Sequence, residues 1–131
     1  MAGSGSSENT GRATQAARQA ERFAAALLAG DHLGAARCFA PEGMCLSRDG
    51  TEVRGRGPVA ALLGQITDSE HRLAIHLGRT LVDGDVALAT QFWTRRSRPS
   101  GSEAFEAPST ARLVLGRCEK RWEILIASPW E

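Results

Sequence analysis

The chain has 131 residues and a formal net charge of +1, with 16 Lys and Arg against 15 Asp and Glu. This length predicts one domain with a single hydrophobic core. The nearly balanced charge gives no large field that would attract nucleic acid or an anionic membrane, so neither is expected as a partner. No apolar run approaches the roughly 20 residues of a membrane helix, and no signal peptide is evident at the N-terminus.

The three cysteines, Cys38, Cys45 and Cys118, are widely spaced. An odd count without a CxxC motif argues against a disulfide framework and against a structural zinc site. We therefore expect free thiols in a reducing compartment, a cytoplasmic location, and no metal or organic cofactor.

Residues 1–11 are mostly small and polar, without an apolar anchor, and predict a disordered tail before a single domain over residues 12–131. A helix is expected to begin at Arg12 or Ala13 and to end at Ala29, where Gly30 tolerates the left-handed conformation of a helix stop. Its apolar residues recur at helical spacing: Ala16, Ala20, Phe23, Ala24, Leu27 and Leu28.

Two short helices and a hairpin complete the first half of the chain. Asp31 predicts an N-cap for a helix over His32–Phe39, which Pro41 cannot continue. Strands over 44–48 and 51–54 flank an Asp-Gly turn. A third helix opens at Gly57-Pro58 and ends by Thr67 or Asp68.

Four long strands follow, over 71–82, 85–96, 103–117 and 121–128, with a bend near Pro108. In the second of these, Leu88, Thr90 and Phe92 lie on the face opposite Trp93. We assign those three residues to the inner side and Trp93 to the outer side. In the last strand, Trp122, Ile124 and Ile126 are expected on one face.

This order predicts an α+β domain in which three helices cover a cone-shaped, curved, mixed or antiparallel sheet of about six strands. A concave apolar cavity between the helices and the sheet would be the default small-molecule site.

Four phrases carry a family resemblance: LLAGDHLGAARCFAPEG, VRGRGPVAALL, LVDGDVALATQFW and KRWEILIASPW. Over Ala13 to Trp130 the chain resembles the nuclear transport factor 2-like superfamily, in its SnoaL-like and ketosteroid-isomerase-like branch. The resemblance implies a cystatin-like α+β barrel. It says less about chemistry, because this fold hosts dehydratases, isomerases, cyclases, epoxide hydrolases and non-catalytic modules.

Ketosteroid isomerases use a Tyr and two Asp residues. The resemblance places Phe23 and Ser47 at the Tyr and first Asp positions, and Thr110 or Ala111 at the second Asp position. Phe23 donates no hydrogen bond, and a serine hydroxyl is too weak a base for a carbon acid. Isomerase chemistry by that mechanism is therefore not expected.

The phrase AIHLGRT is similar to the strand of scytalone-dehydratase-like proteins that carries a pocket His, and His76 matches that position. A histidine there could transfer a proton near neutral pH. The apolar face of the same strand, however, holds Leu73, Ile75 and Leu77. The alternative is that His76 is a surface or dimer-face residue.

The predicted site therefore has His76 as the catalytic group. Arg112 would bind an anion if it points inward, and would be an edge or interface charge if it points outward. Trp130 would close the cavity mouth or cover the sheet edge. The expected substrate-binding residues are Phe23, Leu27, Ser47, Leu88, Thr90, Phe92, Arg112 and Trp130.

Two functional hypotheses remain open. In the first, the protein is a cofactor-independent enzyme, of isomerase, lyase, cyclase or hydrolase type, that acts on a small hydrophobic metabolite. In the second, it is a non-catalytic ligand-binding or dimerisation module, which the missing Tyr and Asp residues favour. A protein-transport adaptor is a third possibility that no motif supports. A homodimer through the convex sheet face, on the Trp93 side, is expected in either case.

Overall fold

The structure is a computed structural model that describes residues 3–47, 49–67, 71–97, 104–105 and 109–129. Its helices are α1 (Gly3–Leu28), α2 (His32–Arg37) and α3 (Arg56–Ile66). Its strands are β1 (Phe39–Leu46), β2 (Glu52–Arg54), β3 (His71–Asp83), β4 (Val86–Ser97), β5 (Ala104–Phe105), β6 (Ser109–Cys118) and β7 (Arg121–Ser128).

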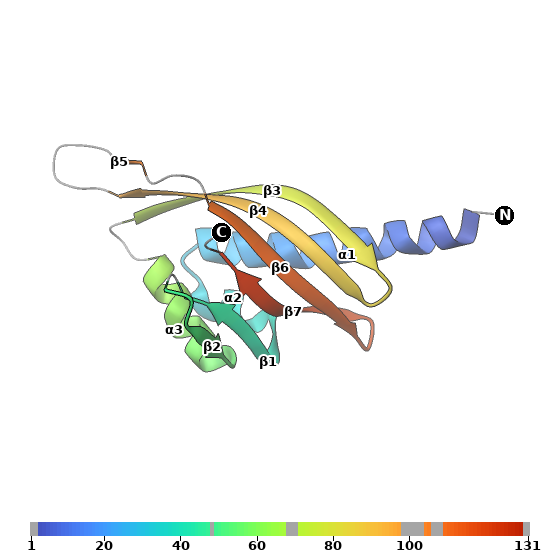
Figure 1. Ribbon diagram of the computed structural model, residues 1–131, viewed down its shortest axis with the longest axis horizontal. Helices are drawn as coiled ribbons and strands as arrows, with labels where there is room; N and C mark the ends of the chain where they lie inside the picture. The colour runs from blue at the N-terminus through green and yellow to red at the C-terminus, as the bar shows by residue number, and fades with distance from the viewer. Residues whose placement is uncertain (1–2, 48, 68–70, 98–103, 106–108, 130–131) are drawn as a thin grey trace.

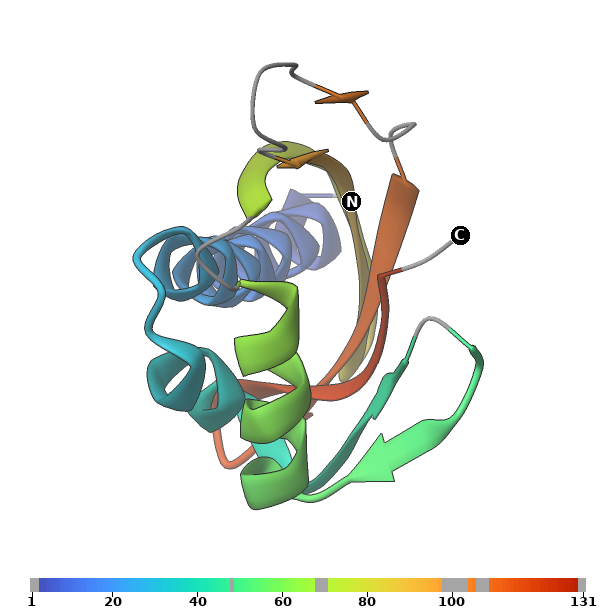
Figure 2. The ribbon, with the colours of Figure 1, turned by 90° about the vertical axis from the view of Figure 1, so that its left-hand side faces the viewer.

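The helices form one layer and the curved sheet wraps around it (Figures 1 and 2). The strand order is β2-β1-β7-β6-β4-β3, and the short β5 pairs with β4. All neighbours are antiparallel except β1 and β7, which run parallel. This confirms the predicted α+β class with a curved mixed sheet. The sheet is open, with β2 and β3 at its two ends.

Helix α1 packs its small and apolar stripe against the sheet and α2. Ala16, Ala20, Phe23 and Leu27 are all buried, as the helical spacing predicts. Leu28 was expected on the same face but is 53% exposed. It lies about 100° around the helix from Leu27, which places it past the edge of the buried stripe.

The beginning of α1 differs from the sequence prediction. The helix starts at Gly3, whereas a start at Arg12 or Ala13 and a disordered tail over residues 1–11 are predicted. Once a helix is nucleated, each added residue gains a backbone hydrogen bond, which allows poor helix formers to extend it. The helix start is therefore corrected, while the division into a tail and a domain over residues 12–131 stays a prediction.

The corner between α1 and α2 forms as predicted. Gly30 adopts a φ of +74°, and the Asp31 carboxylate accepts a hydrogen bond of 2.9 Å from the Gly34 N–H. Helix α2 ends at Arg37. Its short length suffices to bury Ala35 and Ala36 under α1 and α3.

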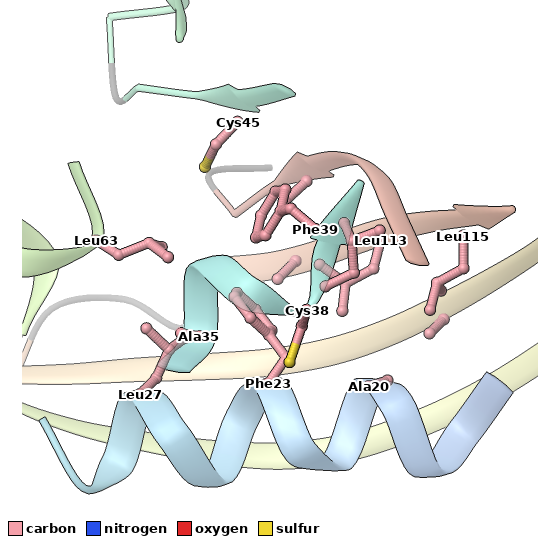
Figure 3. Close-up of a cluster of buried hydrophobic side chains, with 14 of the residues drawn as sticks. Ala20, Phe23, Leu27, Ala35, Cys38, Phe39, Cys45, Leu63, Leu113 and Leu115 are labelled. Carbon is pink, nitrogen blue, oxygen red and sulfur yellow. The ribbon is translucent and has the colours of Figure 1, made fainter. Parts of the chain in front are cut away.

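Strand β1 begins at Phe39, five residues before the predicted start at Met44. Its pairing with β7 is interrupted between Phe39 and Met44. Pro41 lies in this interval and has no N–H to donate to the ladder, which explains the irregular register. The early start places the Phe39 ring in the centre of the core (Figure 3).

Candidate functional site

The space between α1 and the sheet, where the sequence predicts a cavity, contains large side chains. Phe23 packs edge-on against Phe39, with ring centroids 5.6 Å apart, and its ring centroid lies 6.2 Å from that of Trp93. Leu63 from α3 and Leu113 from β6 are fully buried in the same cluster (Figure 3). In this part of the molecule the inner layer is a packed core.

One polar side chain, Gln91, is buried in this layer, and both its amide nitrogen and its amide oxygen are hydrogen-bonded. Its Nε2 donates a hydrogen bond of 3.0 Å to the Ala20 carbonyl on α1. Its Oε1 accepts a hydrogen bond of 3.0 Å from Trp93 Nε1. This network ties β4 to α1 and explains how the indole N–H of Trp93 is satisfied in the core.

The inner layer offers little acid–base chemistry. Among the buried residues that the structure describes, Gln91 is the only polar or charged side chain apart from the two cysteines. The titratable groups there are the thiols of Cys38 and Cys45. Burial raises the pKa of Cys45 to about 12. It also raises the pKa of Cys38, against an opposing effect from the positive charge of Arg22. Both thiols therefore stay protonated near neutral pH and are poor nucleophiles there.

Two of the predicted wall residues, Phe23 and Leu27, lie in the inner layer. Leu88 and Thr90 are half-buried and Phe92 is 45% exposed, all on the outer face. The prediction had the two faces of β4 reversed, because Trp93 is 1% exposed and points inward. The inward positions before it, Ala87 and Ala89, are small, which lets α1 pack closely on the strand.

His76 and Arg112, the two predicted charge-bearing groups, are both exposed on the outer face. His76 pairs across the strands with Phe92, and Arg112 pairs with Thr90. The structure therefore groups five of the predicted residues, Leu88 among them, but on the side of the sheet away from Phe23. The proton-transfer role of His76 stays a prediction.

The other two predicted residues are not part of this group. Ser47 follows β1 in the turn before β2, where its hydroxyl donates a hydrogen bond to the Asp49 carboxylate. That bond and those from Thr51 lower the pKa of Asp49 to about 2. Ser47 therefore serves the turn. Trp130 lies outside the described residues. Among those residues, no three His, Cys, Asp or Glu side chains gather into a metal site.

The outer face of the sheet carries a cluster of apolar side chains from four strands. Cross-strand pairing aligns Leu81 with Leu88, Leu88 with Val114, and Val114 with Ile126. Beside them, Leu125 lies over Gly116, where an added Cβ would come within 2.8 Å of its side chain. We define the outer patch as Leu81, Val86, Leu88, Phe92, Val114, Leu125 and Ile126.

Sequence reasoning missed most of this patch. The prediction put Ile126 on the same face as Trp122 and Ile124. The register of β6 and β7 shifts between Val114 and Leu115, so Ile124 faces inward at 0% exposure while Ile126 is 36% exposed. A bulge reverses the alternation beyond it, and no turn residue marks this one.

Solved structures with the same arrangement identify the fold. An NTF2-like protein with a cystatin-like fold from Novosphingobium aromaticivorans matches with a TM-score of 0.70 and 21% identity, over 88% of this chain and 78% of that one. A ketosteroid isomerase-like protein from Erwinia carotovora atroseptica matches with a TM-score of 0.73 and 11% identity, over 88% and 92%. The chain has the NTF2-like, cystatin-like fold. The predicted superfamily resemblance is confirmed at the level of the fold.

A third similar structure is a Thiobacillus denitrificans protein assigned as a calcium/calmodulin-dependent protein kinase type II association domain. It matches with a TM-score of 0.67 and 18% identity, over 86% of this chain and 93% of that one. No protein-family model and no curated protein sequence matches this chain.

The NTF2-like fold allows the three isomerase positions to be placed. Phe23 is buried in the core and Ser47 lies in a turn, as described above. The register of β6 decides the third position: Ala111 faces inward at 0% exposure, and its neighbour Thr110 pairs with Phe92 on the outer face. None of these side chains offers a carboxylate or a phenol to the inner layer.

Proposed function

We propose that this chain is a non-catalytic association module in which two copies pack together through the outer patch. The observation that carries the proposal is the exposure of contiguous apolar side chains on a broad sheet face. Leu81 and Val86 are 51% and 52% exposed, and Phe92, Leu125 and Ile126 are 36–45% exposed. Contiguous apolar surface of this kind marks an interaction site more often than an ordinary monomer surface.

A second copy of the chain is the occupant that fits this patch best. Twisted sheets pack face to face with their side chains interdigitated, and a two-fold axis through the patch would match each apolar side chain with an apolar surface. Burying the exposed part of five such side chains contributes about 1 kcal/mol each or more. The similarity to a protein assigned as an association domain supports the same role.

The competing hypothesis is a cofactor-independent enzyme that acts on a hydrophobic metabolite. It requires His76 to share a cavity with Phe23 and Leu27. The placement of His76 on the outer face and of packed aromatic rings around Phe23 favours the association module instead. On the proposed interface, His76 and Arg112 would be polar groups at or beside the contact between copies.

The test is a charge placed within the patch, with a matched charge placed elsewhere. Phe92→Lys and Ile126→Lys put an ammonium into the proposed interface, while Leu33→Lys makes the same change on α2 at a residue that is 59% exposed. In sedimentation velocity, the first two variants should sediment as monomers, and Leu33→Lys should remain dimeric. Equal behaviour of all three variants would refute the interface.

The cellular location belongs to the same proposal. Cys38, Cys45 and Cys118 are all free thiols, which is typical of proteins from reducing compartments. No helix in the described part of the chain is long and apolar enough to cross a membrane. We propose that the module works in the cytoplasm.

A further inference from the structure

A cationic groove lies between α1 and the turn that joins β6 to β7. Its volume is about 250 Å³, and its lining comes from one face of the helix and from the start of β7. The lining residues are Gln15, Arg18, Gln19, Arg22, Lys120, Arg121 and Trp122. The groove is separate from the outer patch, so it is independent of the proposed association.

The lining of this groove holds four cations and no carboxylate. Within the described part of the chain, none of the four has a carboxylate within the 4.0 Å of an ion pair. The whole protein has a net charge of only +1, so this concentration of positive charge is local. Four like charges around one hollow repel one another, and an anion between them would relieve the repulsion.

The indole of Trp122 provides a second, independent observation. Trp122 lines the groove but is only 5% exposed, and its Nε1 is buried without a hydrogen-bond partner among the described residues. Buried indole N–H groups usually find an acceptor, and leaving one unpaired is costly. Trp93 shows the usual case, since its N–H donates to Gln91. A small shift of the indole toward the groove would let an anionic oxygen there supply the acceptor that Trp122 lacks.

The backbone of the turn holds the cations in place. Glu119 and Lys120 adopt φ values of +51° and +66°, a conformation that favours Asn and Gly. This turn brings Lys120 and Arg121 to the groove opposite Arg18 and Arg22 on α1. Arginine guanidinium groups bind phosphate and carboxylate oxygens in a bidentate manner.

We propose that this groove binds a small organic anion that carries at least two negative charges on phosphate or carboxylate oxygens. Arg18 and Arg22 from the helix and Lys120 and Arg121 from the turn would bind the charged oxygens. The amides of Gln15 and Gln19 would bind neutral polar groups beside them. The volume is below the roughly 300–1,000 Å³ of pockets for drug-sized ligands, which limits the ligand to a small molecule.

The test is calorimetric titration of the full chain with pyrophosphate and, separately, with citrate, to distinguish the phosphate from the carboxylate arm. Arg18→Gln and Arg22→Gln should each weaken binding about tenfold, because each removes one charged hydrogen-bond donor. Arg54→Gln is the matched control, since Arg54 lies on β2 at the far edge of the sheet. Its affinity should equal that of the unmodified protein.

An NMR measurement gives a readout that general surface charge would not affect. Addition of the bound anion should shift the indole N–H resonance of Trp122 downfield as it gains an acceptor, while that of Trp93 should stay in place. Lys120→Gln should reduce this shift at a given anion concentration. Binding of neither anion at millimolar concentration would overturn the proposal. So would equal weakening by Arg54→Gln, or an unmoved Trp122 resonance at saturation.

Discussion

Gln91 and Trp93 form the polar contact on which the inward orientation of β4 depends, and a double-mutant cycle tests it. Gln91→Leu removes the oxygen that accepts a hydrogen bond from the indole N–H of Trp93. This N–H is buried, because Trp93 is only 1% exposed. An orphaned buried donor costs roughly 1–3 kcal/mol. The Ala20 carbonyl loses its Gln91 donor but keeps the donor within its helix, so it adds little.

The second single variant, Trp93→Phe, leaves the Gln91 carbonyl oxygen without its donor, which again costs roughly 1–3 kcal/mol. The smaller ring also opens a void that costs about 1 kcal/mol or more. The double variant keeps the void but removes both orphaned groups. Its loss of stability should therefore be smaller than the sum of the two single losses by both orphan costs together, roughly 2 kcal/mol or more.

Urea unfolding monitored by circular dichroism measures all four free energies. Thermal unfolding gives an independent check, at roughly 4 °C per kcal/mol for a domain of this size. Gln91→Glu is a useful companion, because it keeps the shape and places a charge in the core. If both single variants changed the free energy of unfolding by less than about 0.5 kcal/mol and added independently, Trp93 would lie on the surface and the assigned face of β4 would be wrong.

Three further predictions follow from local geometry. Replacing Glu119 and Lys120 by Asn and Gly should stabilise the fold by about 1–2 kcal/mol, since both positions have positive φ; no gain in urea midpoint would contradict it. Gly43→Ala should destabilise by roughly 1–3 kcal/mol, because its Cβ would lie 2.8 Å from the Ile124 carbonyl oxygen; an unchanged melting temperature would count against it. Burial raises the pKa of the Cys45 thiol from its reference value of 9.0 to about 12 in the folded protein. As the pH rises, this thiol therefore loses its proton in the unfolded state before it does so in the folded state. The free energy of unfolding should therefore fall by about 1.4 kcal/mol per pH unit between pH 9 and about 12, and Cys45→Ala should remove that part of the slope.

The sequence predicts the element order well because turn and cap residues act locally. Gly30 and Asp31 end one helix and start the next, and β7 has its predicted bounds. The faces of the strands are harder to predict. Alternation in β4 separates Val86, Leu88 and Phe92 from Trp93, but it does not say which set faces the helices.

The sizes of the apolar side chains in β4 suggest the wrong inner face, because the larger ones would be expected to point into the core. The larger aliphatic side chains point outward, and Ala87 and Ala89 point inward, where α1 packs on them. Close packing of a helix on a sheet requires small residues, so the smaller set marks the inner face here. Only the partner element reveals this, and the partner is not visible in the strand's own pattern. The groove and the orphaned Trp122 N–H depend on tertiary packing in the same way.

The native mass of the unmodified protein is the most direct test of association through the outer patch. Native mass spectrometry at micromolar concentration should give a species of twice the 14.0 kDa chain mass, which Phe92→Lys converts to a single chain. A mass of one chain for the unmodified protein at that concentration would contradict the proposed module.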